Sequence, residues 1–138
     1  MHSARAYANQ YRQTSASSAI LDASPHQLVA LMLGGARERV QLAIACMQRG
    51  DLARKGSAIS DASRIIGGLN GTLDMKAGGE IAAGLTALYD YFQRRLIEAN
   101  SANDPVPLAE VDGLLADIED AWRAIAPDAA STGAQVIG

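Results

Sequence analysis

The 138-residue sequence has one cysteine, two histidines and few aromatic residues, which make up 4% of the chain. Cys46 alone cannot form an intrachain disulfide, and one cysteine cannot supply a zinc site of the usual kind. Neither histidine belongs to a Glu-x-x-His pair, the pattern of di-iron sites in helical bundles. No grouping of acid, base and nucleophile appears either. The sequence therefore predicts no metal, no cofactor, no small-molecule substrate and no enzymatic activity.

Positive charge is not in excess, because the formal net charge is −3 and the pI is about 5.2. Such a balance gives no global attraction for nucleic-acid phosphates or acidic membrane surfaces. No run approaches the ~20 apolar residues of a membrane span, and residues 1–13 lack the apolar segment of a signal peptide. We therefore expect a cytoplasmic protein that binds no nucleic acid and does not insert into membranes.

Hydrophobic residues are plentiful, at 49% of the chain, and they are mainly Leu, Ile, Ala and Met, a mixture that favours helices over sheets. Apolar residues recur at steps of three and four along four segments, as they do in helices buried on one face. This spacing predicts helices over residues 25–49, 52–73, 79–100 and 107–125, joined by short turns. The predicted fold class is all-α, an antiparallel up-down-up-down four-helix bundle.

The first predicted helix has a clear start, because Ser24 suits an N-cap, Pro25 the first helical position and Gln27 the third position of a capping box. We expect residues 24–126 to form the bundle, 1–23 to form a mobile N-terminal cap segment, and 127–138 to be a disordered tail.

Other residues are predicted from their place in the helical pattern. Met32, Met47 and Ile81 fall on predicted core stripes, and Cys46 is expected to be a buried structural thiol. His26 is expected to be a solvated residue of the first turn. The acidic residues of the last helix are expected to form a solvated face: Glu110, Asp112, Asp117, Glu119 and Asp120.

The predicted helices carry more apolar residues than one core stripe needs. Tyr89 and Tyr91 project about 160° apart, because successive helical residues turn by about 100°. Ile97 points away from the predicted core. The remaining surplus residues lie on the flanks of the first two helices: Leu31 with Leu42 on one side, Leu33 with Ile44 on the other, and Ile65.

Two interpretations of these surplus residues are open. They can cover loops, pack against the N-terminal segment or stand singly on the surface. Taken together, they instead indicate grooves that accept an additional amphipathic helix. In that interpretation one of Tyr89 and Tyr91 seals the core and the other contacts the added helix. Tyr7 and Tyr11 are four residues apart, so the N-terminal segment could occupy a groove itself and weaken binding by the free energy of its displacement.

Several motifs occur in one order from about Tyr7 to Ile125, and together they resemble the flagellar secretion chaperone FliS family. The matching segments are ASPHQL (23–28), KG…I…A…II (55–66), GGEIAAGL (78–85), LYDYFQRRLIEAN (88–100), ND (103–104), EV..LL (110–115) and AW (121–122).

The resemblance implies a helical bundle of the bacterial cytoplasm that binds the disordered C-terminal segment of newly made flagellin. Such a chaperone lays that segment over its grooves as helical pieces, prevents premature polymerisation and aids delivery to the export apparatus, with export gate components as further partners and no cofactor. Ala6 and Tyr7 match a family motif in a movable cap over part of this site. One departure occurs at Leu33-Gly34-Gly35, where the family often has an aromatic residue, an Asp and a Gly. The alternative function is a helical-bundle adaptor for another export or regulatory protein.

Overall fold

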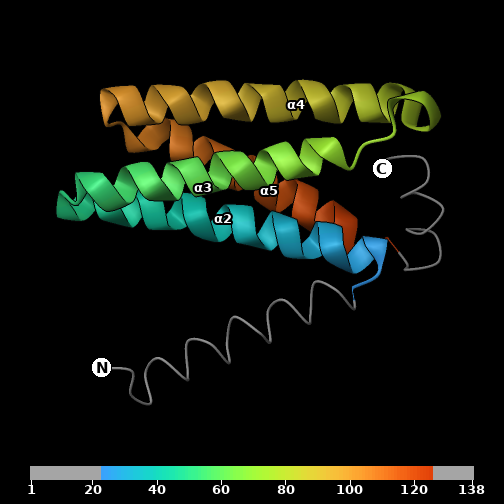
Figure 1. Ribbon diagram of the computed structural model, residues 1–138, viewed down its shortest axis with the longest axis horizontal. Helices are drawn as coiled ribbons and strands as arrows, with labels where there is room; N and C mark the ends of the chain where they lie inside the picture. Colours follow the sequence, from blue (N-terminus) through green and yellow to red (C-terminus); the bar gives the residue numbers. More distant parts are fainter. Residues whose placement is uncertain (1–22, 126–138) are drawn as a thin grey trace, which may run out of the picture.

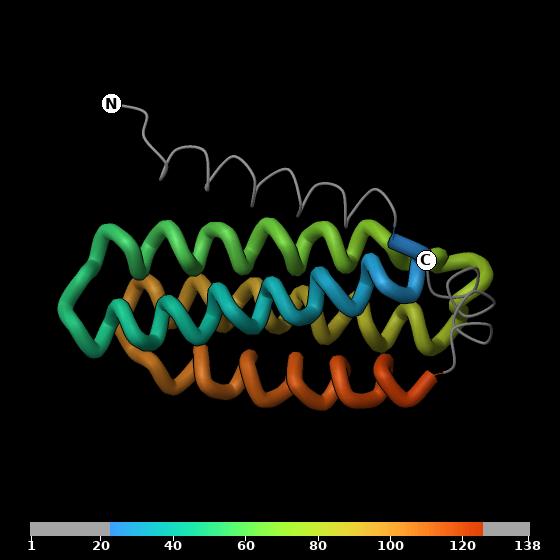
Figure 2. The backbone as a smooth tube through the Cα atoms, turned by 90° about the horizontal axis from the view of Figure 1, so that it is seen from below, coloured from blue at the N-terminus to red at the C-terminus, as the bar shows by residue number. Residues whose placement is uncertain are grey.

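The computed structural model describes residues 23–125, and in this range the chain forms four helices and no strand. They are α2 (Pro25–Arg49), α3 (Leu52–Gly71), α4 (Met75–Ala102) and α5 (Pro105–Arg123). Each helix packs against the next along the chain, and α5 packs against α2, which completes a ring of four (Figure 1). Figure 2 shows α3 and α5 on opposite sides of this ring, with α2 and α4 between them. The predicted all-α antiparallel bundle is confirmed; the predicted cap segment (apart from Ala23) and the tail lie outside the described residues.

The turns form where short polar residues and glycine satisfy the helix ends. The Ser24 side chain accepts a hydrogen bond from the Gln27 N–H, and the Gln27 side chain accepts one from the Ser24 N–H, so the predicted capping box is present. Gly50 ends α2 with a left-handed φ of 72°, and Asp51 then caps α3. These compact turns place consecutive helices side by side in opposite directions.

Five helix boundaries differ from the prediction, one of them the end of α4, which lies at Ala102, two residues after the predicted end. α5 begins at Pro105 rather than residue 107, because Asp104 is its N-cap and a proline in the first turn gives up an N–H that has no helical acceptor. α4 begins at Met75, but Gly79 interrupts it with φ 53° and ψ −128°, so its regular part starts close to the predicted position. α3 ends at Gly71 and α5 at Arg123, each two residues before the predicted end.

The core follows the predicted stripes on α3 and α5 and differs on α2 and α4. On α2 the buried residues are Leu33, Ala36, Val40, Ala43 and Cys46, so Cys46 is buried as expected. The prediction had placed Met32 and Met47 in the core, but both are only partly buried. Met32 instead extends toward α3, where its Cε would lie 2.8 Å from a Cβ on Gly68, and Met47 lies in the last turn of α2.

On α4 the correction concerns Ile81, which is 61% exposed, whereas its neighbour Ala82 is fully buried. Ile81 lies two residues after the Gly79 interruption, so the helical pattern of the residues before Gly79 does not predict which face Ile81 is on. None of the helices within residues 23–125 combines the length and apolar character needed to cross a membrane.

Candidate partner-binding grooves

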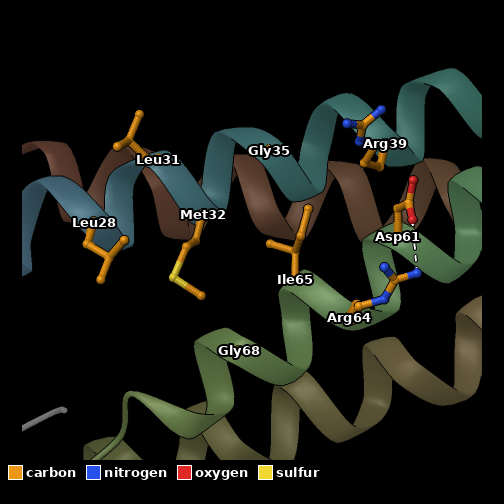
Figure 3. A pocket seen from close by; sticks show the side chains of 9 residues that line it. All are labelled: Leu28, Leu31, Met32, Gly35, Arg39, Asp61, Arg64, Ile65 and Gly68. Atoms are coloured by element: carbon orange, nitrogen blue, oxygen red, sulfur yellow. Dashed lines mark hydrogen bonds and ion pairs between the residues drawn. The ribbon is translucent and has the colours of Figure 1, made fainter. Parts of the chain in front are cut away.

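A groove runs between α2 and α3, and we call it the α2/α3 groove (Figure 3). It has a volume of about 520 Å³ and is open to solvent. Two of the predicted groove residues, Leu31 and Ile65, line it, and Leu31 is 49% exposed. Its complete lining is Leu28, Leu31, Met32, Gly35, Arg39, Asp61, Arg64, Ile65 and Gly68.

Glycines on both helices shape this groove. A Cβ atom on Gly68 would stand 2.8 Å from Met32 Cε, and one on Gly35 would stand 3.6 Å from Ile65 Cδ1. The side chains of Met32 and Ile65 therefore lie close to the backbone of the opposite helix, and a Cβ on Gly68 would displace Met32, whereas one on Gly35 would make ordinary contact with Ile65. Gly35 belongs to the Leu33-Gly34-Gly35 departure, so that departure contributes directly to the groove.

Charged groups gather at one end of the α2/α3 groove. Figure 3 shows Leu28, Leu31 and Met32 toward one end, and Arg39, Asp61 and Arg64 toward the other. Arg64 Nη2 lies 3.1 Å from Asp61 Oδ1, and Arg39 forms no ion pair with any described residue. The formal charges of these three groups sum to +1, opposite in sign to the whole chain.

A second groove lies between α3 and α4, and we call it the α3/α4 groove. The predicted residue Ile97 lines it, and Arg64 lines both grooves. Its lining is more polar than that of the first groove. Ser63 and Gln93 join the two helices there through hydrogen bonds from Ser63 Oγ to Gln93 Oε1 and from Gln93 Nε2 to the Ser63 carbonyl, at 2.5 and 2.9 Å.

A third cavity, the end pocket, lies where α2 begins and α5 ends, and it has a volume of about 400 Å³. Tyr89 and Trp122 line it. The His26 ring stacks on Trp122 with centroids 5.3 Å apart, and Trp122 Nε1–H donates to the His26 carbonyl at 2.9 Å. The expectation of a solvated His26 is therefore wrong, since this residue joins the start of α2 to the end of α5.

Tyr89 and Tyr91 have different environments. Tyr89 is 4% exposed and belongs to the core, and burial raises the pKa of its hydroxyl to about 12. Tyr91 is partly buried, and its hydroxyl donates to Glu110 Oε1 at 2.5 Å. One tyrosine thus seals the core as predicted, while the other joins α4 to α5.

Glu110 is shared between two donors. Arg95 Nε also donates to its Oε1, at 2.8 Å. The hydrogen bond from Tyr91, followed by that from Arg95, lowers the pKa of the Glu110 carboxyl, and the same contact with Glu110 raises the pKa of the Tyr91 hydroxyl. Arg94 adds a cation–π contact, with its guanidinium carbon 5.8 Å from the Tyr91 ring centroid.

The other flank of α5 is fastened to α2 by Arg37, whose guanidinium contacts Asp112 at 2.9 Å and Glu119 at 2.8 Å. These hydrogen bonds raise the pKa of Arg37, so it stays charged under all ordinary conditions. The acidic residues of α5 were expected to form a solvated face. That expectation is wrong for Asp112 and Glu119, which are partly buried and bonded to α2, whereas Glu110 is exposed as expected although it also bonds to α4.

The remaining predicted site residues are dispersed. Leu33 is fully buried, so the expectation that it lies on a flank is wrong. Ile44 is partly buried against the core, and Leu42 is exposed on α2 without lining any of the three cavities. Tyr7 and Tyr11 lie outside the described residues.

Sequence reasoning missed Met32, Arg39 and Arg64 as groove residues. Two glycine pairs carried a usable signal, Gly34-Gly35 on α2 and Gly67-Gly68 on α3, because glycine inside a helix often marks a close approach of another element. No group of three or more His, Cys, Asp or Glu residues is placed to hold a metal ion within residues 23–125.

Comparison with known proteins gives a consistent result. The family model described as flagellar protein FliS matches residues 7–129. A flagellar secretion chaperone FliS of Salmonella typhimurium is 46% identical over 120 residues, which cover 86% of this chain and 89% of that protein. A flagellar secretion chaperone FliSB of Pseudomonas aeruginosa is 42% identical over 116 residues, or 84% and 92% of the two chains. The corresponding Bacillus subtilis protein is 36% identical over 113 residues, or 82% and 80%. The chain therefore belongs to the FliS family of flagellar proteins.

Proposed function

We propose that this chain is a cytoplasmic chaperone of flagellar export that binds the C-terminal segment of flagellin, which we call the guest segment. The relatives' names supply the chaperone role and the export process. The observation that carries the binding mode is the α2/α3 groove, where exposed Leu31 and partly buried Met32 and Ile65 present apolar surface between two helices. An amphipathic helix buries such surface by laying its apolar face into the groove.

The guest segment is held as helical pieces, one of them in the α2/α3 groove and another along the α3/α4 groove around Ile97. Sequestering the segment keeps flagellin from polymerising before export. Components of the export gate are the second class of partner, which receive the chaperone together with its guest. We further propose that the N-terminal cap segment, residues 1–23 with Tyr7 and Tyr11, covers part of this surface until the guest displaces it.

Calorimetric titration with flagellin of the same organism tests the proposal. Full-length flagellin should bind, and flagellin without its last ~40 residues should not. Binding should show a large negative heat-capacity change, because a disordered segment folds and buries apolar surface as it binds. Failure of both forms to bind would contradict the proposal and favour an adaptor for another protein.

A leucine pair locates the site. Leu31→Ala should weaken binding by about 5- to 30-fold, the equivalent of about 1 to 2 kcal/mol for a partly exposed leucine that becomes buried. Leu52→Ala is the matched control, since Leu52 is 56% exposed, close to the 49% of Leu31, and lines none of the three cavities. Equal weakening by both variants would place the guest elsewhere.

A further inference from the structure

We propose that the α2/α3 groove selects a guest helix that carries a carboxylate about two turns from its apolar anchor residues, and that Arg39 and Arg64 receive this carboxylate. The inference rests on the proposed function, and it adds the chemistry by which the groove recognises its guest. Its basis is the separation, within one groove, of apolar side chains from guanidinium groups (Figure 3).

The spacing follows from α2 itself. Leu31 and Arg39 are eight residues apart on one straight helix, which at about 1.5 Å per residue is about 12 Å. A guest helix lying along the groove covers this distance in about two turns. The apolar residues of the guest helix then contact Leu31, Met32 and Ile65, and a guest side chain about two turns further along reaches Arg39.

The sign of the charge disfavours a basic guest residue at this end and favours an acidic one. Arg39 and Arg64 outnumber Asp61, the one acidic group in the lining, so the local formal charge is +1 on a chain of net charge −3. Arg39 is exposed, and no carboxylate of the described residues forms an ion pair with it. A guest carboxylate would give it a partner.

Arg64 can exchange its partner at little cost. Its side chain is 75% exposed in the ion pair with Asp61, and exposed pairs of this kind contribute little to stability. Because Arg64 also lines the α3/α4 groove, its guanidinium lies where a guest crossing α3 from one groove to the other would pass.

The test compares one double variant, with one substitution on α2 and one on α3, with a matched control. Arg54 is also on α3, is 77% exposed, and pairs with the aspartate three residues before it, as Arg64 does, but it lines no groove. Calorimetry measures the affinity of a peptide of the last ~40 residues of flagellin for three proteins: the unaltered chain, the double variant Arg39→Gln/Arg64→Gln, and Arg54→Gln. A second peptide has every Asp and Glu replaced by Asn and Gln.

The double variant should bind the native peptide about 3- to 10-fold more weakly at 50 mM salt, the range of two partly exposed ion pairs. The loss should shrink at 500 mM salt, which screens such pairs. The peptide with Asn and Gln in place of Asp and Glu should bind the double variant and the unaltered chain equally, and Arg54→Gln should match the unaltered chain throughout.

Two results would overturn the inference alone. One is equal affinity of the double variant and Arg54→Gln for the native peptide. The other is that the double variant loses as much affinity for the peptide with Asn and Gln in place of Asp and Glu as it does for the native peptide. In both cases the native peptide still binds, and the proposed function stands. If the native peptide does not bind the unaltered chain, the proposed function fails and the inference fails with it. Thermal melts of each variant confirm that the fold is retained.

Discussion

Leu31 and Leu33 are two positions apart and have opposite roles, although the helical pattern gave both the same prediction. Leu33 is fully buried in the core, whereas Leu31 is half exposed in the groove. Leu33→Ala should reduce the free energy of unfolding by about 2 to 5 kcal/mol, because it removes buried methyl groups and leaves a cavity. Leu31→Ala should reduce it by less than about 1 kcal/mol. Urea denaturation of both variants measures the difference in the free energy of unfolding, and equal losses would contradict the difference in burial between Leu31 and Leu33.

Lys55 is a charged residue that is buried in the structure, with 6% of its surface exposed. Its ammonium donates to the Asn100 carbonyl at 3.1 Å and to Asn103 Oδ1 at 3.2 Å, at the end of α4. Lys55→Met should cost about 1 to 3 kcal/mol of stability, because the acceptors lose their donor while the methionine fills similar space. Arg54→Met, one residue earlier and exposed, is the control. Similar denaturation midpoints for the two variants would refute this role for Lys55.

At the scale of the helices, local chemistry was sufficient for most of the fold. The Ser24 capping box and the stop at Gly50 both appear where the sequence predicts them, because these residues act on their own backbone. Which face of each helix is buried was harder to predict. The buried line of α2 depends on two neighbours, α3 and α5, and the phase of α4 changes at Gly79.

The candidate site could be predicted only in part, for a related reason. Leu31, Ile65 and Ile97 line grooves, since surplus apolar residues beside a core stripe lie next to an adjoining helix, and their contact with a partner stays a prediction. Arg39 and Arg64 could not be assigned from the sequence. Exposed arginines occur on every polar face, and only the pairing of α2 with α3 brings these two to the same end of one groove.

The adjacent glycines Gly67 and Gly68 make a test of how α2 and α3 approach each other. A Cβ on Gly67 would meet no atom within 4 Å, so Gly67→Ala should stabilise the chain by about 0.5 to 1 kcal/mol through helix propensity. The Cβ of Gly68→Ala would lie 2.8 Å from Met32 Cε, too close for contact, so the Met32 side chain must move. Gly68→Ala should therefore stabilise the chain less than Gly67→Ala, and it should weaken guest binding because Met32 moves into the groove. Melting temperatures and titrations of both variants measure this; identical behaviour would contradict the close approach at Gly68.

At the scale of the whole molecule, the two sides of the ring differ in how they are joined. On both flanks of α5, charged side chains join it to its neighbours, through Arg37 toward α2 and Glu110 toward α4. On both flanks of α3 there are open grooves instead. The α5 side of the bundle is thus held by ion pairs, whereas the α3 side combines hydrogen bonds with α4 that involve Ser63, Gln93 and Lys55 with apolar surface that lies mainly in the α2/α3 groove.

This arrangement makes stability depend on pH through Glu110. Its pKa is lowered from 4.5 by the hydrogen bonds from Tyr91 and Arg95, so the unfolded chain takes up the proton at a higher pH than the folded chain. The stability from these bonds is therefore complete above about pH 4.5 and is lost as the pH falls through the lower folded pKa. Glu110→Gln should be less stable than the unaltered chain at pH 7, and the difference should shrink as the pH falls.

Denaturant titrations at pH 7, 4.5 and 3 follow this difference in the free energy of unfolding. Tyr91→Phe removes one of the two donors, so it should show a smaller loss at pH 7 that also shrinks in acid. Asp117→Asn is the control, because Asp117 is an exposed carboxylate on the same helix with no ion pair among the described residues. A Glu110→Gln deficit that stays constant from pH 7 to pH 3 would mean that packing, rather than the ionised carboxylate, joins α4 to α5. Guest binding at pH 7 should be unchanged in all three variants, because these residues line neither groove of α3.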